Sequence, residues 1–130
     1  MSRALGAEGE RQAARFLKKQ GYKIVTQNFR VRGGEVDIIA RDGRTLVFVE
    51  VKARHGHRFG EPHWAVDLKK RRHLTLAAMV YMIRERIGEK ACRFDLVLIE
   101  TDAGTKESRF ELIKNAFDAE IQGCGGRGGP

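Results

Sequence analysis

The sequence has few cysteines and no long hydrophobic run. Its two cysteines lie in different settings, since Cys92 opens an expected strand and Cys124 sits in a glycine-rich tail. A disulfide bridge between them is not expected, which favours a reducing compartment. The lack of a secretory hydrophobic segment and of a long apolar span predicts a cytoplasmic protein with no membrane partner.

Acidic residues are also scarce relative to basic ones. The chain has 25 lysines and arginines against 17 aspartates and glutamates, which gives a formal net charge of +8. This surplus favours an anionic partner, and nucleic acid ranks before a membrane because no basic segment carries a lipid-facing aromatic stripe. Charge alone does not decide the matter, because many basic cytoplasmic proteins bind other partners.

The length of 130 residues predicts one domain. A chain of this size buries about 68% of the surface that its unfolded form exposes, so it does not need disulfides to fold. We assign residues 1–121 to this domain and residues 122–130 to a flexible glycine-rich tail.

Hydrophobic periodicity and turn signals predict an α/β domain. Helices are expected over residues 2–20 and 65–87, with a short one over 115–121, and strands over 22–31, 34–40, 46–52, 93–99 and 109–113. The fourth strand should run parallel to the third, because a helical crossover connects them. The predicted buried stripe of the second long helix is Leu68, Leu76, Met79, Val80 and Ile83.

Charged residues stand in the central hairpin where apolar residues are expected. Asp37 lies in the first arm, and Glu50 and Lys52 share one face of the second arm, about 6.6 Å apart. Buried charges of this kind cost several kcal/mol unless they are paired or bind something. Glu10 lies on the buried stripe of the first helix, where it either pairs with a basic residue at the core boundary or joins the same site.

These residue types suit the hydrolysis of a phosphodiester. Asp37, Glu50 and the main-chain carbonyl of Val51 offer oxygen ligands for Mg²⁺ or Mn²⁺, with waters completing the octahedron. Glu10 would reach the metal directly or through water. The metal would lower the pKa of a bound water, while Lys52 orients that water or stabilises the developing negative charge.

At these residues the sequence resembles the PD-(D/E)xK nuclease superfamily, and more specifically the small bacterial YraN family, which is similar to archaeal Holliday junction resolvases. The resemblance covers roughly residues 6–99 and is carried by residues 6–10, 34–37, 48–54, 70 and 93–95. It implies a restriction-endonuclease-like core in the order helix, three strands, helix, strand, with a central mixed sheet of about five strands flanked by helices.

The resemblance also implies roles for single residues. It places Glu10, Asp37, Glu50 and Lys52 at catalytic positions, and Lys70 at a basic position of the second helix. The chain departs from the family pattern at residue 36, where valine stands in place of a frequent proline. This difference concerns backbone shape rather than metal ligation.

Basic residues after the hairpin predict a track for the nucleic-acid backbone. They are Arg54, Arg58, Lys69, Lys70 and Arg72. The loop over residues 53–64 also holds three histidines, for which phosphate contact or solvation fits better than zinc, because no thiolate accompanies them.

The expected function is a metal-dependent nuclease, with DNA favoured over RNA and branched or damaged DNA among the substrates. The alternative is a catalytically silent nucleic-acid-binding module whose acidic cluster is structural, and a more remote one is a protein-interaction subunit. The acidic set favours the nuclease, because carboxylates that repel phosphate bring a pure binder no benefit. Resolvase-like enzymes cut two strands, which favours a homodimer, although no apolar stripe marks an interface.

Overall fold

The computed structural model describes residues 2–55, 66–88 and 90–119. In chain order the elements are α1 (Ser2–Lys19), β1 (Lys23–Val31), β2 (Gly34–Asp42), β3 (Thr45–His55), α2 (Leu68–Arg84), β4 (Cys92–Thr101) and β5 (Ser108–Phe117). The strands form one sheet in the order β1-β2-β3-β4-β5, with β3 and β4 parallel and all other neighbours antiparallel. The expected α/β fold, a mixed five-stranded sheet flanked by two helices, is confirmed.

The expected tail over residues 122–130 lies outside the described residues, so its separation from the domain stays a prediction. Within the described ranges, neither helix combines the length and the apolar character that crossing a membrane would require.

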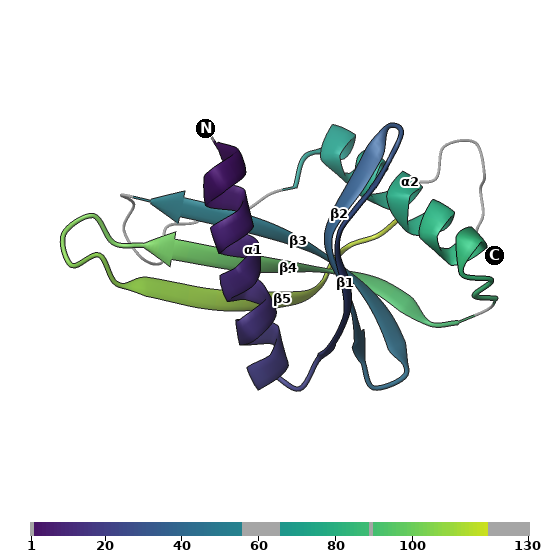
Figure 1. Cartoon of the computed structure of the whole chain (residues 1–130), viewed down its shortest axis with the longest axis horizontal. Coiled ribbons are helices and arrows are strands. Elements are labelled where there is room, and N and C mark those ends of the chain that lie inside the picture. Colours follow the sequence, from purple (N-terminus) through teal and green to yellow (C-terminus); the bar gives the residue numbers. More distant parts are fainter. Residues whose placement is uncertain (1, 56–65, 89, 120–130) are drawn as a thin grey trace.

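Helices α1 and α2 lie on opposite faces of the sheet (Figure 1). Each face carries its own hydrophobic cluster, under its helix. Successive residues of β3 point to opposite faces. Val49 therefore packs in the same cluster as Leu17 of α1, whereas Phe48 shares the other cluster with Leu74 of α2. The same alternation continues along β3, so the side chains of Glu50 and Lys52 lie on the face that α2 covers.

The buried face of α2 differs from the predicted one. Four members of the predicted stripe, namely Leu68, Leu76, Met79 and Ile83, are at least 40% exposed, and the fifth, Val80, is half-buried. The helix buries Leu74, Thr75, Ala77, Ala78 and Tyr81 instead.

The backbones of α2 and β2 lie close together, which explains why small residues form part of the buried face of this helix. A Cβ atom built on Gly34 of β2 would lie only 2.4 Å from the carbonyl oxygen of His73 and 3.4 Å from the Cβ of Ala77. The helix thus rests directly on the start of β2, where large side chains do not fit. It also begins later than predicted, because the Asp67 side chain caps it by accepting the N–H of Lys70 at 2.8 Å.

The end of the chain also departs from expectation. Residues 115–117, predicted to begin a short helix, belong to β5, and residues 120 and 121 lie outside the described part. Phe117 pairs with Phe94 of β4 and stacks on its ring at 4.9 Å between centroids. This contact with the core holds the segment in the sheet.

A buried polar network ties β4 to its neighbours. Asp95 is fully buried and accepts hydrogen bonds from the Tyr22 hydroxyl at 2.6 Å, the Arg93 Nε at 2.9 Å and the Asn115 N–H at 2.9 Å. Arg93 also pairs with Asp42 at the end of β2, at 2.6 Å. Burial, followed by the hydrogen bond to Asp95, raises the pKa of Tyr22 well above its ordinary value, so the hydroxyl stays a donor.

Candidate metal centre and nucleic-acid interface

The two central strands separate where the acidic residues lie. The β2–β3 ladder ends at the pair Ile38 and Val49. One residue further on, the Asp37 carboxylate accepts the main-chain N–H of Val51 at 2.8 Å. A side chain therefore takes the place of a backbone acceptor, and Asp37 is held in the fork between the strands.

Glu50 enters the same region from β3. Its side chain is only 6% exposed, and the Nζ of Lys70 lies 3.5 Å from its Oε2. Lys70 stands in the first turn of α2, whose start the Asp67 cap fixes. The ion pair thus joins α2 to the central strand.

Glu10 arrives from α1. Its half-buried carboxylate and that of Glu50 both lie within hydrogen-bonding reach of Asp37. Asn28 of β1, which stands opposite Asp37 and has a left-handed backbone with φ of 55°, also hydrogen-bonds Glu10. Carboxylates from three elements therefore lie next to one another, with Asp37 between the other two.

This crowding disfavours ionisation of the outer two acids. Burial, and then the negative charge of Asp37, raises the pKa of Glu10 to about 7 and that of Glu50 to about 8. The positive charges of Lys70 and Lys52 oppose the rise at Glu50 without cancelling it. Burial lowers the pKa of Lys70, but neighbouring carboxylates outweigh it and raise the pKa overall. The two lysines therefore do not fully offset the negative charge of the carboxylates.

Two observations test whether these residues fit a metal ion. Within the described ranges, the buried Oε1 atoms of Glu10 and Glu50 have no hydrogen-bond partner, so each has capacity for a cation or a donor. No three His, Cys, Asp or Glu side chains of the described segments form a ready metal cage. Magnesium is usually held by one or two carboxylates plus waters and substrate oxygens. The pair Asp37 and Glu50, with Glu10 beside it and the Val51 carbonyl on the same strand, fits that pattern.

The other predicted residues are placed differently. Lys52 is half-buried on β3, and its charge acts on Glu50. Arg54 forms an ion pair with the buried Glu100 of β4, so its charge is already matched. Lys69 and Arg72 are exposed on α2. Arg58 lies outside the described residues, as does most of the histidine-containing loop.

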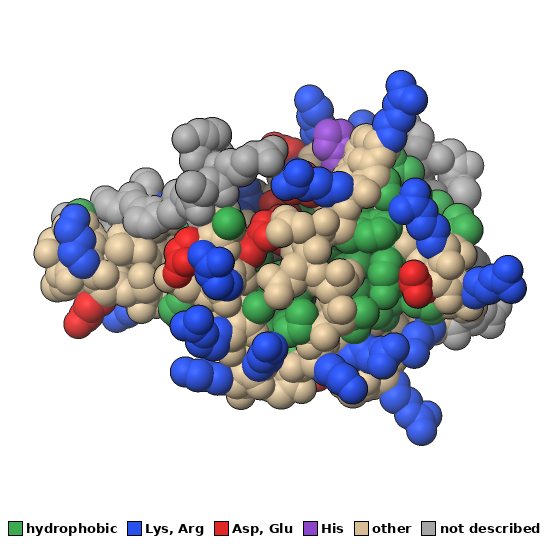
Figure 2. All heavy atoms as spheres, viewed as in Figure 1, with side chains coloured by type: hydrophobic (Ala, Val, Ile, Leu, Met, Phe, Trp, Pro, Cys, Tyr) green, Lys and Arg blue, Asp and Glu red, His purple; other side chains and the backbone are tan. Residues whose placement is uncertain are grey.

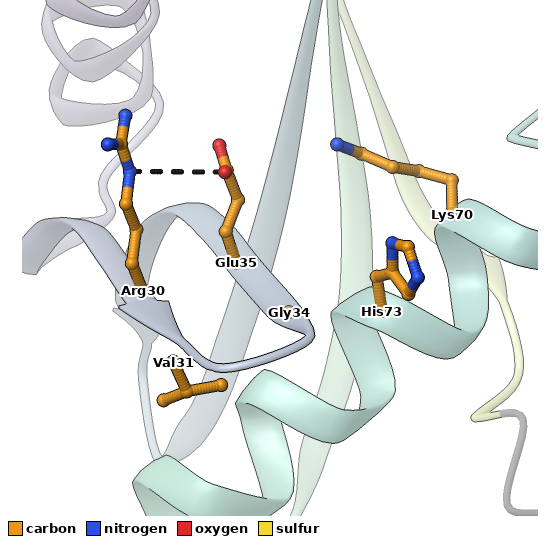
Figure 3. Close-up of a pocket in the computed structure, with 6 residues that line it drawn as sticks. All are labelled: Arg30, Val31, Gly34, Glu35, Lys70 and His73. Carbon is orange, nitrogen blue, oxygen red and sulfur yellow. Dashed lines mark ion pairs between the residues drawn. The ribbon is translucent and has the colours of Figure 1, made fainter.

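A pocket of about 200 Å³ beside the carboxylates was not predicted from the sequence. It is lined by Arg30, Val31, Gly34, Glu35, Lys70 and His73 (Figure 3). The register of β1 and β2, which places Arg30 opposite Glu35, was a usable signal for one side of it. The contribution of α2 was not, because it depends on how the helix packs.

Comparison with known proteins places these residues in a family. The model of "Uncharacterised protein family UPF0102" matches residues 9–99, which include all four predicted catalytic positions. A UPF0102 protein of Symbiobacterium thermophilum is 47% identical over 119 residues, covering 92% of this chain and all of that protein. One from Caldicellulosiruptor saccharolyticus is 45% identical over 115 residues, covering 88% of this chain and 98% of its own length. The chain therefore belongs to the uncharacterised protein family UPF0102.

Proposed function

We propose that this protein is a metal-dependent nuclease that hydrolyses phosphodiester bonds in DNA. The observation that carries the proposal is the convergence of Glu10 and Glu50 on Asp37, with buried carboxylate oxygens that have no partner among the described residues. The order α1-β1-β2-β3-α2-β4 also supports the restriction-endonuclease-like core of the PD-(D/E)xK superfamily, and with it the likeness to the YraN family and to Holliday junction resolvases.

Each residue has a distinct task in this proposal. Asp37 and Glu50 hold Mg²⁺ or Mn²⁺, which when bound supplies a Lewis acid and an activated water. Lys70 balances the charge of Glu50 from α2, at 3.5 Å. Lys52 offers a positive charge on the same face for the phosphate or the attacking water. Glu10, next to Asp37, would bind the metal directly or through a water.

The charge distribution supports an anionic substrate. Helix α2 has no acidic residue in its first turn and instead carries basic residues from Lys69 to Arg72. Positive side chains at a helix N-terminus oppose the helix dipole, at about 0.3–1 kcal/mol each, and an anion bound there removes the penalty. On the face shown in Figure 2, lysine and arginine side chains lie around much of the outline and acidic ones are fewer.

Cleavage of a substrate panel tests the proposal. Linear, flapped and four-way DNA, with a matched RNA duplex, would be incubated with wild type, Asp37→Asn and the exposed control Glu111→Gln, in Mg²⁺, Mn²⁺ or chelator. We expect metal-dependent cleavage by wild type and Glu111→Gln and none by Asp37→Asn. Binding of DNA in chelator should be equal or tighter for Asp37→Asn, because a repelling charge is removed.

Thermal melting in the same conditions separates the enzyme from the binding module. A nuclease site predicts that Mg²⁺ raises the melting temperature of wild type and not that of Asp37→Asn. If wild type cleaves nothing and gains nothing from Mg²⁺ while Asp37→Asn simply melts early, the acidic cluster is structural, since breaking a buried charge network costs about 3–5 kcal/mol. Sedimentation of wild type with and without DNA would test the homodimer.

A further inference from the structure

The pocket between the β1–β2 turn and α2 is distinct from the carboxylate cluster, and we call it the turn pocket. Its lining consists of Arg30, Val31, Gly34, Glu35, Lys70 and His73. At about 200 Å³ it is smaller than the roughly 300–1,000 Å³ of sites for drug-sized ligands. It therefore suits a small group rather than a whole cofactor.

The walls of the turn pocket are set by backbone contact. Gly34 begins β2 directly against α2, and a side chain there would meet the His73 carbonyl oxygen at 2.4 Å. Strand and helix therefore cannot move independently at this point. Arg30 and Glu35 face the pocket from the strands, and Lys70 reaches toward it from the helix (Figure 3).

Arg30 is held only loosely in the pocket. Its Nε lies 3.9 Å from Glu35 Oε1, and the two side chains are 51% and 40% exposed. Exposed pairs of this kind contribute little to stability, because water and salt screen the attraction. A phosphate group offers a guanidinium two parallel charge-assisted hydrogen bonds, which are stronger than this contact. Arg30 is therefore available to exchange Glu35 for a phosphate.

Lys70 connects the turn pocket to the carboxylate cluster. The same side chain lines the pocket and lies 3.5 Å from Glu50. Glu35, on the pocket wall, is two residues before Asp37 on β2. When one phosphate of a nucleic-acid strand lies at the carboxylates, the adjacent phosphate of that strand therefore comes near Arg30.

We infer that the turn pocket is a subsite for a backbone phosphate of the nucleic acid, with Arg30 as its main contact and Glu35 as the group displaced on binding. That this phosphate is the one adjacent to the phosphate being cleaved rests on the proposed nuclease function. The subsite itself rests on the pocket, its loose ion pair and its shared lysine.

Binding without metal tests the subsite independently of cleavage. The full chain would be titrated into a fluorescein-labelled DNA duplex in chelator at several salt concentrations, as wild type, Arg30→Gln, Glu35→Gln and Arg44→Gln. Arg44 is also an exposed arginine, but it lies in the turn at the opposite end of β2, so it serves as the matched control.

The three variants should change DNA binding in different ways. Arg30→Gln should weaken binding about fivefold and make the salt slope shallower by about 0.9, the value for one phosphate contact. Glu35→Gln should tighten binding, because Arg30 loses its competitor. Arg44→Gln should leave the slope unchanged. Equal slopes for Arg30→Gln and Arg44→Gln, or weaker binding by Glu35→Gln, would overturn the subsite.

Amide chemical shifts locate the anion directly. With inorganic phosphate as the probe and chloride at equal ionic strength as the reference, the Gly34 and His73 amides should shift in wild type and not in Arg30→Gln. Shifts spread evenly over exposed lysines and arginines would refute the subsite. A chain that cleaves no DNA but shows these effects keeps the subsite and loses the nuclease, whereas a chain that cleaves DNA without them does the reverse.

Discussion

The carboxylate of Asp37 accepts the main-chain N–H of Val51 at 2.8 Å, where β2 and β3 part. Asp37 therefore has a structural task that is independent of any ligand. This bond fixes the carboxylate between Glu10 and Glu50, and it makes the effect of a substitution depend on whether the new side chain still has an acceptor.

Substitution of Asp37 by alanine should destabilise the protein more than substitution by asparagine. Asparagine keeps an oxygen for the Val51 N–H, whereas alanine leaves a partly buried donor unsatisfied, at a cost of about 1 kcal/mol. Urea denaturation of both variants at pH 7 measures the difference. Equal midpoints for the two would show that the bond adds nothing to stability.

Glu50→Gln should gain stability relative to wild type as the pH rises from 5 to 8 without metal. The pKa of Glu50 in the folded state, about 8, lies above its ordinary value of 4.5, because burial and Asp37 disfavour the charge. Its contribution to wild-type stability is therefore complete below pH 4.5 and is lost as the pH rises through 8. Glutamine does not titrate, so the melting temperature of Glu50→Gln should rise relative to that of wild type as the pH increases. The exposed Glu111→Gln should show no such trend.

Magnesium should act most strongly on wild type at the alkaline end of this range. A bound cation favours the ionised form of Glu50, so Mg²⁺ should restore the melting temperature that wild type loses between pH 5 and 8. Glu50→Gln should gain much less from Mg²⁺ at pH 8. A Mg²⁺ effect of equal size in both proteins would place the ion elsewhere.

Gly34→Ala should destabilise the protein by about 1–3 kcal/mol, the usual cost of overpacking. The added methyl group would meet the His73 carbonyl at 2.4 Å, and backbone cannot rotate away as a side chain can. Gly88→Ala is the matched control, because a Cβ there meets nothing within 4 Å. Denaturation midpoints of the two variants measure the contrast, and an unaffected Gly34→Ala would mean that α2 does not rest on β2.

Tyr22→Phe should cost about 1–3 kcal/mol, because the Tyr22 hydroxyl donates to the fully buried Asp95 and accepts from Arg93. Tyr81→Phe, in a ring that packs edge-on against Phe29 and Phe48, provides the comparison. Thermal and urea denaturation would measure the loss. If Tyr22→Phe unfolds at the same midpoint as wild type, the hydrogen bond between Tyr22 and Asp95 does not stabilise the protein.

The sequence predicted the parts of the site that depend on local periodicity. Alternation along β3 placed Glu50 and Lys52 on one face, and helical spacing placed Glu10 on the inner side of α1, close to Asp37. Both patterns are properties of a single element, so they are readable without knowing how the elements pack.

The features that depend on how helix and sheet pack together could not be predicted from the sequence. The stripe predicted for α2 was wrong because the helix meets the sheet through small residues around Ala77, where Gly34 brings the backbones together. Lys70 was expected on a phosphate track, which stays a prediction, and its ion pair with Glu50 could not be read from the sequence. The turn pocket was missed for the same reason, since His73 joins Arg30 only when the helix is in place.

The parallel pairing of β3 with β4 has a consequence for how the protein folds. Asp37 and Glu50 belong to one hairpin closed by the two-residue turn after Asp42, a contact that forms locally on a time scale of about 1–10 μs. Lys70 reaches Glu50 from α2, within the long crossover that β4 must complete. Contacts of large sequence separation form later. We therefore expect the nascent chain to bring its carboxylates together before their counter-charge arrives, so that a divalent cation present during folding meets an acidic hairpin not yet neutralised by the helix.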